Sequence, residues 1–195
     1  MNIKDCDYTL DEALTGVEIP RNIKKDLCIV SVKYYSFDGK LHEGQLVIFK
    51  DLKTDIISIF DELEKEKFPV AKIIPVVAYN WSDSASMEDN NTSAFNYRLV
   101  KGTDRLSNHA LGKAIDINPQ LNPQIKKDEV LPVNGSYEPG KPGTITKNSI
   151  VVNAFKKKGW VWGGEWESSK DYQHFEKLNS KIFFRFLKNI NGLMF

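Results

Sequence analysis

The sequence predicts one α+β domain in which helices flank a central antiparallel sheet. Three observations indicate this class: runs with strand-like alternation, runs with helical spacing, and no regular strand–helix–strand rhythm between them. The length of 195 residues suits one domain with a sizeable core. We expect residues 1–29 to form an extension packed on the main domain, which spans residues 30–195.

The first predicted elements are a hairpin and a helix. Residues 26–50, DLCIVSVKYYSFDGKLHEGQLVIFK, contain two β-rich runs around SFDGK. Asp-Gly is a strong turn signal, so this segment predicts a β-hairpin. Residues 51–68 predict a helix, because their apolar side chains recur at helical spacing. These side chains are Ile56, Ile59, Phe60 and Leu63.

The middle of the chain is less regular. A short strand is expected within residues 72–79, bracketed by prolines. Residues 80–98 are polar, rich in Ser and Asn and poor in periodicity, which predicts a long loop, and long ordered loops are often functional. Residues 113–118, KAIDIN, predict a strand. The proline- and glycine-rich residues 119–145 predict an irregular excursion, either a lid or a surface loop.

The last elements follow from caps and short apolar runs. NSIVVNAFKKKGW, residues 148–160, predicts a helix capped by Asn148 or Ser149. The remaining expectations are a strand and turn at 160–166, a strand at 172–178 and an amphipathic closing segment at 180–190.

Composition excludes several classes of protein. Hydrophobic residues make up 41% and charged residues 27%, which is typical of a soluble globular chain. The net charge of +1 gives no global field for nucleic acid, and no apolar run is long enough to span a bilayer. The start lacks the pattern of a signal peptide, so the chain acts where it is made, is exported by another route, or has lost a leader. Cys6 and Cys28 are expected to be free thiols.

One of the three histidines lies in SNHALGKAID, residues 107–116. If the end of this stretch forms a strand, Asp116 lies on its polar face, where a carboxylate must be paired or must bind a cation. His109 lies an odd number of residues away, and Gly112 permits the turn that brings both side chains to one point. Imidazole and carboxylate are good zinc ligands. Taken alone, the stretch fits a cap or a surface loop as well as half of a metal site.

A second stretch, DYQHFE, holds His174 with a carboxylate on either side. On a strand His174 and Glu176 face the same way, so Glu176 can orient the imidazole ring or a neighbouring cation. Asp171 lies just before the strand and can reach the same point. A catalytic zinc needs three protein ligands, an open position for water and a free carboxylate for the proton, and the two stretches together supply this set.

Both stretches fit longer motifs, SxHxxGxAxD and DxxHFE, in the right order. They resemble the zinc D-alanyl-D-alanine carboxypeptidase and peptidoglycan L,D-endopeptidase family, peptidase family M15. The similarity extends over roughly residues 30–180 through FDGKLHEGQLV, SMEDNNTSAFNYR, IDINPQLNP and GWVWGGEW, which are similar to its carboxypeptidase-like branch. The resemblance implies a hedgehog/DD-peptidase-like fold.

The resemblance also implies a role for each matching position. His109, Asp116 and His174 match the family's zinc ligands. Asp171 matches the catalytic base, where many members have Glu and the phage endopeptidase branch has Asp. Chemistry agrees with this pairing, because zinc lowers the pKa of bound water to near 7 and a modest carboxylate base then suffices.

Further positions are carried over from the family less directly. The arginine that stabilises the developing oxyanion matches Arg98, with Arg105 as a nearby alternative. Ser107 is expected to line the substrate site and also fits a cap or turn. His42 is expected to make a structural hydrogen bond on the hairpin. Three tryptophans are expected mainly in the core, with the second or third as a candidate pocket wall: Trp160, Trp162 and Trp166.

The implied activity is that of a zinc-dependent peptidase that cuts an amide bond in peptidoglycan stem peptides of the bacterial cell wall. D-alanyl-D-alanine carboxypeptidase is the first expectation, and an endolysin-type L-alanyl-D-glutamate endopeptidase is the alternative. A non-catalytic zinc-binding module is a third. The implied partner is peptidoglycan or its stem peptides, and no nucleic acid is expected. We expect a monomer. Because of its substrate, we expect the protein in the cell envelope or outside the cell.

Overall fold

The computed structural model describes residues 2–127 and 129–178, and the predicted segment at 180–190 lies outside them. The longer elements are β2 (Leu27–Tyr35), β3 (Leu41–Phe49), α3 (Lys53–Lys65) and α5 (Ile150–Lys157). The short helices are α1 (Leu10–Ala13), α2 (Arg21–Lys24), α4 (Asp83–Glu88) and the 3-10 turns η1 (Lys50–Leu52), η2 (Val76–Tyr79), η3 (His109–Leu111) and η4 (Gly163–Glu165). The short strands are β1 (Ile3–Lys4), β4 (Lys72–Ile73), β5 (Asn91–Thr92), β6 (Ala114–Asp116), β7 (Gln124–Lys126), β8 (Glu129–Leu131), β9 (Val161–Trp162), β10 (Lys170–Asp171) and β11 (His174–Glu176).

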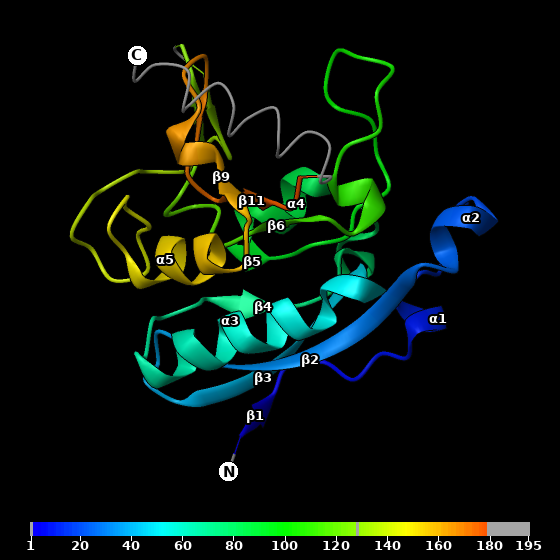
Figure 1. The fold of residues 1–195 in the computed structure, drawn as a ribbon, viewed down its shortest axis with the longest axis horizontal. Helices are drawn as coiled ribbons and strands as arrows, with labels where there is room; N and C mark the ends of the chain where they lie inside the picture. The colour runs from blue at the N-terminus through cyan, green and yellow to red at the C-terminus, as the bar shows by residue number, and fades with distance from the viewer. Residues whose placement is uncertain (1, 128, 179–195) are drawn as a thin grey trace, which may run out of the picture.

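Helix α3 lies at the centre of the arrangement. The hairpin of β2 and β3 packs on one side of it, and α5 packs on another, beside the short strands β6, β9 and β11 (Figure 1). The predicted hairpin is confirmed, with nine antiparallel pairs from Leu27 opposite Phe49 to Tyr35 opposite Leu41. The predicted helices are confirmed as α3 and α5, and the Ser149 hydroxyl caps α5 by accepting from the backbone N–H of Val152 at 3.4 Å.

The described strands divide into four small sheets. Their orders are β1-β3-β2, β10-β7-β8, β6-β11-β9 and β4-β5. The mixed helix-and-strand class and the single domain are therefore confirmed. The expected central sheet is not, because outside the hairpin no described strand exceeds three residues. The hedgehog/DD-peptidase-like arrangement and the boundary at residue 30 stay predictions.

One hydrophobic core joins the hairpin of β2 and β3 to the sheet formed by β6, β11 and β9. Ile56, Ile59 and Leu63 on the inner face of α3 have no solvent exposure. The same cluster includes Ile115 of β6 and Phe175 of β11, and Phe175 stacks on Phe155 of α5 with ring centroids 4.1 Å apart. Burial of each large apolar side chain stabilises the fold by about 1.5–3 kcal/mol. Strands β6 and β11 are thus fixed from behind by the core.

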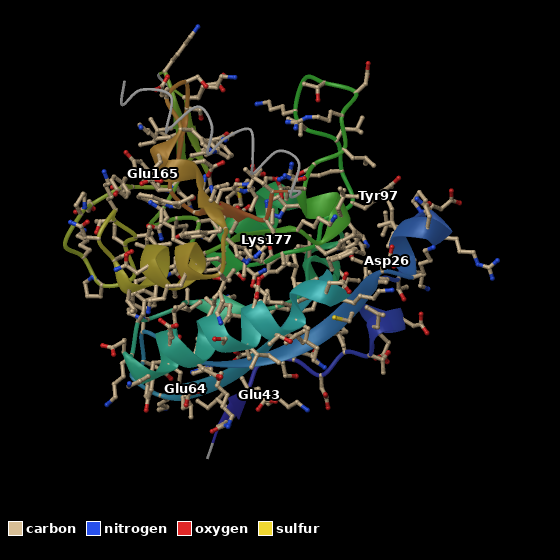
Figure 2. All side chains as sticks on the ribbon, viewed as in Figure 1. Asp26, Glu43, Glu64, Tyr97, Glu165 and Lys177 are labelled. Atoms are coloured by element: carbon tan, nitrogen blue, oxygen red, sulfur yellow. The ribbon has the colours of Figure 1, made fainter. Side chains whose placement is uncertain are left out.

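Lys177, just after β11, adds a polar tie to α3. Its ammonium group donates to the Asp55 carboxylate at 2.9 Å and to the backbone carbonyl of Lys158. Figure 2 shows Lys177 near the middle of the molecule, in contrast to Glu43 and Glu64 at its edge. Trp160 donates its indole N–H to the same Asp55 carboxylate at 3.2 Å. The chain that leaves β11 is therefore attached to the central helix.

Three middle segments differ from their predictions. Residues 80–98 contain α4 and β5, so the prediction of a plain loop is wrong; the Ser82 hydroxyl caps α4 by accepting from the N–H of Ala85 at 3.2 Å. Residues 72–79 form a strand only at their start, because Pro75 leads into the 3-10 turn η2. The excursion at 119–145 includes the antiparallel pair β7 and β8. Helices and strands of two to six residues are too short to show a period.

The cysteine and membrane expectations can also be compared with the fold. Cys6 and Cys28 are both free, as predicted, and half-buried. Within residues 2–127 and 129–178, no helix combines the length and the apolar content that crossing a bilayer requires.

Candidate metal centre

A tight turn at Gly112 brings the first two predicted ligands together. His109 begins η3, and Gly112 ends it in the left-handed region at φ +64°. A Cβ atom at Gly112 would lie 2.5 Å from the backbone nitrogen of Phe49, which itself donates to the Gly112 carbonyl at 2.8 Å. Glycine is therefore required both for the backbone angle and for the close approach to β3. The chain then enters β6, which ends at Asp116.

Strand pairing brings in the third predicted ligand. In the antiparallel pair of β6 and β11, His174 lies directly opposite Asp116. The carboxylate of Asp116 lies 2.9 Å from Nδ1 of His174 and 3.2 Å from Nε2 of His109. The two imidazole nitrogens are 3.2 Å apart. The ligand atoms of these three buried residues thus lie within 4.8 Å of one another, and the predicted convergence is confirmed.

Hydrogen bonds on the far side of each ring set the tautomers. Nδ1 of His109 lies 2.6 Å from the carbonyl oxygen of Ala94 and donates to it, so Nε2 keeps its lone pair. Nε2 of His174 lies 3.3 Å from the Glu176 carboxylate and donates to it, so Nδ1 is the nitrogen that can bind a metal ion once the proton it shares with Asp116 is displaced. Asn108 donates to the same Glu176 oxygen at 2.5 Å. Glu176 therefore orients the His174 ring, as predicted from its place two residues along the strand.

The charges of the three groups favour a cation at this point. Burial raises the pKa of Asp116, but His109 and His174 outweigh it and hold that pKa well below its usual range. Burial lowers the pKa of His174, yet its hydrogen bonds to Asp116 and Glu176 raise it to about 10. A positive charge is therefore favoured between the rings and the carboxylate, either as a proton on His174 or as a metal ion bound through the nitrogen lone pair that this proton would occupy. Two histidines and one carboxylate fit a catalytic zinc site, which uses three protein ligands.

Asp171 lies beside this cluster as a separate carboxylate. It is 8% exposed, and its Oδ2 accepts a hydrogen bond from the amide of Gln124 at 2.7 Å. Its Oδ1 is buried and has no hydrogen-bond partner among the described residues. Burial raises the pKa of Asp171 to about 6, His174 opposes this shift, and Asp116 adds to it. Asp171 is thus a carboxyl group with an unusually high proton affinity and one unused oxygen.

Comparison with known families gives this arrangement a context. Residues 101–177, which include all three converging ligands and Asp171, match the family described as D-alanyl-D-alanine carboxypeptidase. The match supports peptidase family M15, and residues 101–177 are called the M15 segment from here on. No solved structure matches the chain.

Arg98 lies just before the M15 segment and shares its cleft. Its guanidinium forms an ion pair with Asp83 of α4 at 3.1 Å, and its Nε is buried without a hydrogen-bond partner among the described residues. Arg105 lines the same cleft but is exposed. Arg98 is therefore the better-held of the two predicted oxyanion candidates, while its catalytic role stays a prediction.

Ser107 also lines the cleft, where it is 6% exposed. Its hydroxyl accepts a hydrogen bond from the backbone N–H of His109 at 3.2 Å, so it supports the turn that carries the first ligand. This contact agrees with the expectation of a turn hydroxyl. Its predicted contact with substrate stays a prediction.

The cleft of the M15 segment has a volume of about 650 Å³. Its lining includes the three converging ligands, Asp171 and Arg98. Strands β7 and β8 also contribute side chains to this lining. Trp166 forms part of the wall, with its ring centroid 5.3 Å from that of His174, whereas Trp160 and Trp162 are buried in the core, as expected. The volume suits a short peptide segment.

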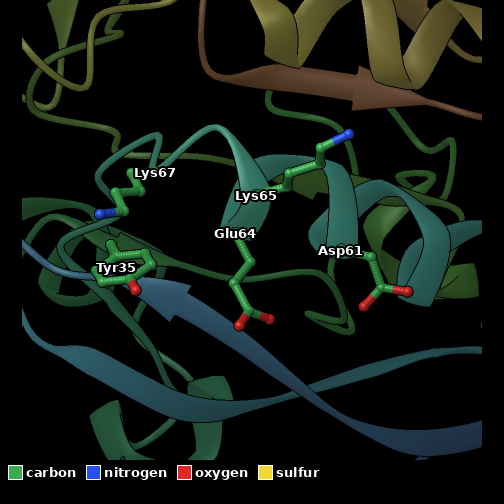
Figure 3. A pocket seen from close by; sticks show the side chains of 5 residues that line it. All are labelled: Tyr35, Asp61, Glu64, Lys65 and Lys67. Atoms are coloured by element: carbon green, nitrogen blue, oxygen red, sulfur yellow. The ribbon is translucent and has the colours of Figure 1, made fainter.

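A second hollow, of about 360 Å³, lies between α3 and the end of β2. Figure 3 shows its lining residues, with the Lys67 side chain over the Tyr35 ring. Its charged groups are two acids, Asp61 and Glu64, followed by two lysines, Lys65 and Lys67, and it includes no histidine or cysteine. None of these residues lines the cleft of the M15 segment, so this hollow is separate from the candidate site.

Sequence reasoning missed three residues that hold the candidate groups in place. Asp83 holds Arg98, Gln124 holds Asp171, and Asn108 holds the carboxylate of Glu176. Asp83 lies in the helix that was expected to be loop, and Gln124 lies in the expected irregular excursion. Of the three, only Asn108 could have been suspected from the sequence, because it lies within the first motif and directly before His109.

Proposed function

We propose that this protein is a zinc-dependent peptidase that hydrolyses an amide bond in peptidoglycan stem peptides, and that it is a D-alanyl-D-alanine carboxypeptidase. One observation carries the proposal: two histidines and an aspartate converge in a cleft of an M15 segment, with a second, unliganded carboxylate beside them. His109, Asp116 and His174 would hold the zinc ion. Zinc in such a site supplies Lewis acidity and lowers the pKa of water to near 7.

The other residues of the cleft then have complementary roles. Asp171 accepts the proton of the attacking water, and its raised pKa makes it a stronger base than an exposed carboxylate. Arg98 faces the same cleft with a fixed positive charge, which stabilises the negative charge that develops on the carbonyl oxygen. Ser107 and Trp166 contribute to the substrate-facing wall. The substrate places the protein in the cell envelope or outside the cell, and we expect it to act as a monomer.

A mass-spectrometric assay separates the two peptidase activities. The zinc-loaded protein is incubated with a pentapeptide that ends in D-Ala-D-Ala and, separately, with intact muropeptides. Loss of one terminal alanine identifies the carboxypeptidase. Release of the stem peptide beyond its first alanine identifies the L-alanyl-D-glutamate endopeptidase, the alternative favoured by Asp rather than Glu at position 171.

Asp171→Asn tests the role of the base in the same assay. The substitution keeps the shape of the side chain and all three metal ligands, so zinc content should be unchanged while turnover falls by about 10²- to 10⁴-fold. Asp61→Asn, on the exposed surface of α3, is the matched control and should retain full activity. Wild-type protein with stoichiometric zinc and no cleavage of any stem peptide would leave a non-catalytic zinc-binding module, and protein without zinc would refute the metal site.

A further inference from the structure

The carboxylate of Asp171 is held by a neutral side chain on the neighbouring strand. Strand β7 pairs antiparallel with β10, and this register places Gln124 directly opposite Asp171. The amide nitrogen of Gln124 donates to Oδ2 of Asp171 at 2.7 Å, which is short and well within hydrogen-bond range. The bond is therefore set by backbone pairing and not by chance contact between two long side chains.

This single bond leaves the two oxygens of Asp171 in different states. Oδ2 is engaged by Gln124, whereas Oδ1 is buried and has no partner among the described residues. A carboxylate held at one oxygen cannot rotate freely about its terminal bond, so the position of the other oxygen is fixed as well. The second oxygen is then available to accept a proton from a group in the cleft.

The chemistry of the holding group matters for a base. A lysine or arginine at position 124 would form an ion pair with Asp171 and lower its proton affinity strongly. An amide donates one hydrogen bond without a full charge, so it restrains the carboxylate and lowers its pKa less than an ammonium or guanidinium group would. Gln124 thus combines fixed geometry with retained basicity, and these are the two properties that a general base needs.

The strand that carries Gln124 is itself attached to the M15 motif. The backbone N–H of Tyr172 donates to the carbonyl of Pro123 at 3.4 Å, and the amide of Gln173 donates to the carbonyl of Leu131 at 3.5 Å. Tyr172 also stacks on Tyr137 of the same excursion, with ring centroids 3.6 Å apart. The open end of the hairpin of β7 and β8, where Gln124 pairs with Leu131, is therefore held against the two residues that precede His174.

We propose that Gln124 is a positioning residue that fixes Asp171 for proton transfer, and that the hairpin of β7 and β8 serves in this cleft to present it. The inference rests on the proposed function, in which Asp171 is the base. The proline-rich excursion at 119–145 then has a defined role, because it brings Gln124 to the cleft. Gln124 belongs to the sheet of β10, β7 and β8, whereas Asp116 and His174 belong to the sheet of β6, β11 and β9.

Two nearly isosteric substitutions test the proposal. Gln124→Met removes the donor and keeps the length of the side chain, and Gln124→Glu replaces the donor by a like charge facing Asp171. Gln45→Met is the matched control, because Gln45 is a buried glutamine whose amide bonds to the backbone of Tyr8 at 2.7 and 3.2 Å, away from the cleft. For each variant, zinc content, thermal unfolding, kcat and KM are measured, and crystal structures locate the Asp171 carboxylate.

The expected result is a split between kcat and KM. Both Gln124 variants should bind zinc normally and lose about 10- to 100-fold in kcat, with KM nearly unchanged and with Asp171 displaced or in several rotamers. Gln45→Met should lower the unfolding temperature without changing kcat per folded molecule. The proposal is overturned if Asp171 keeps its position and kcat is unchanged in Gln124→Met. Displacement of Asp171 in a protein that cleaves no stem peptide would support the positioning role and refute the proposed function separately.

Discussion

Replacing Gly112 by alanine should damage the fold and the metal centre together. Gly112 has a left-handed backbone, which costs a non-glycine residue about 1–2 kcal/mol. The added Cβ would also lie 2.5 Å from Phe49 N and 2.8 Å from Ile48 C. Both atoms belong to the backbone of a paired strand and cannot move cheaply, so overpacking adds about 1–3 kcal/mol. The total loss in unfolding free energy is then about 2–5 kcal/mol.

Gly39→Ala is the matched control for this substitution. Gly39 also has a positive φ, of +75°, but a Cβ there would meet no atom within 4 Å. The gain from a less flexible unfolded chain applies to both variants and cancels in the comparison. Urea titration should therefore show a loss of about 1–2 kcal/mol for Gly39→Ala and a larger loss for Gly112→Ala. Zinc affinity should fall only in Gly112→Ala, and equal stability with equal zinc affinity in the two variants would refute the reasoning.

Three further predictions concern the supports of the site and of the hairpin. Glu176→Gln should weaken zinc binding by about 10- to 100-fold in a competition titration, because the ring it orients loses a charged acceptor. Asp83→Asn should free Arg98 and lower kcat by about tenfold or more with normal zinc content, measured by steady-state kinetics. Burial lowers the pKa of His42, but its two aspartate partners outweigh this and raise it, so stability from this group is complete below about pH 6.5 and is lost as pH rises through the folded pKa. Urea midpoints of wild type and His42→Ala should therefore converge between acidic and alkaline pH, and a constant difference would contradict this.

The residues that the sequence predicted best are those whose chemistry is unusual for their place. A carboxylate in the apolar run around Asp116 and a histidine beside two acids at His174 both need a partner, and the structure supplies each to the other. Gly112 was predicted as a turn because His109 and Asp116 are an odd number of residues apart, and on a straight strand they would face opposite sides. In each case a residue type does not fit its neighbours in the sequence, and this mismatch can be recognised before the fold is known.

The supports were not predictable, because they depend on pairing between distant segments. Gln124 and Asp171 are 47 positions apart, and nothing in PQIKK distinguishes a cleft amide from a surface one. Asp83 was hidden because α4 has only six residues, fewer than two full turns. The central sheet was not confirmed for a related reason: alternation predicts strands, but tertiary contacts decide which strands pair.

The spacing of the three ligands along the chain gives the metal a further consequence. Asp116 and His174 are separated by 58 positions, and His109 and His174 by 65, so the site does not exist until the loop between them has closed. A bound cation acts there as a removable cross-link, because it lowers the free energy of the closed chain and leaves the open chain nearly unchanged. Metal uptake should therefore report the folding step that closes this loop. Added chelator should shorten the lifetime of the native state even when no substrate is present.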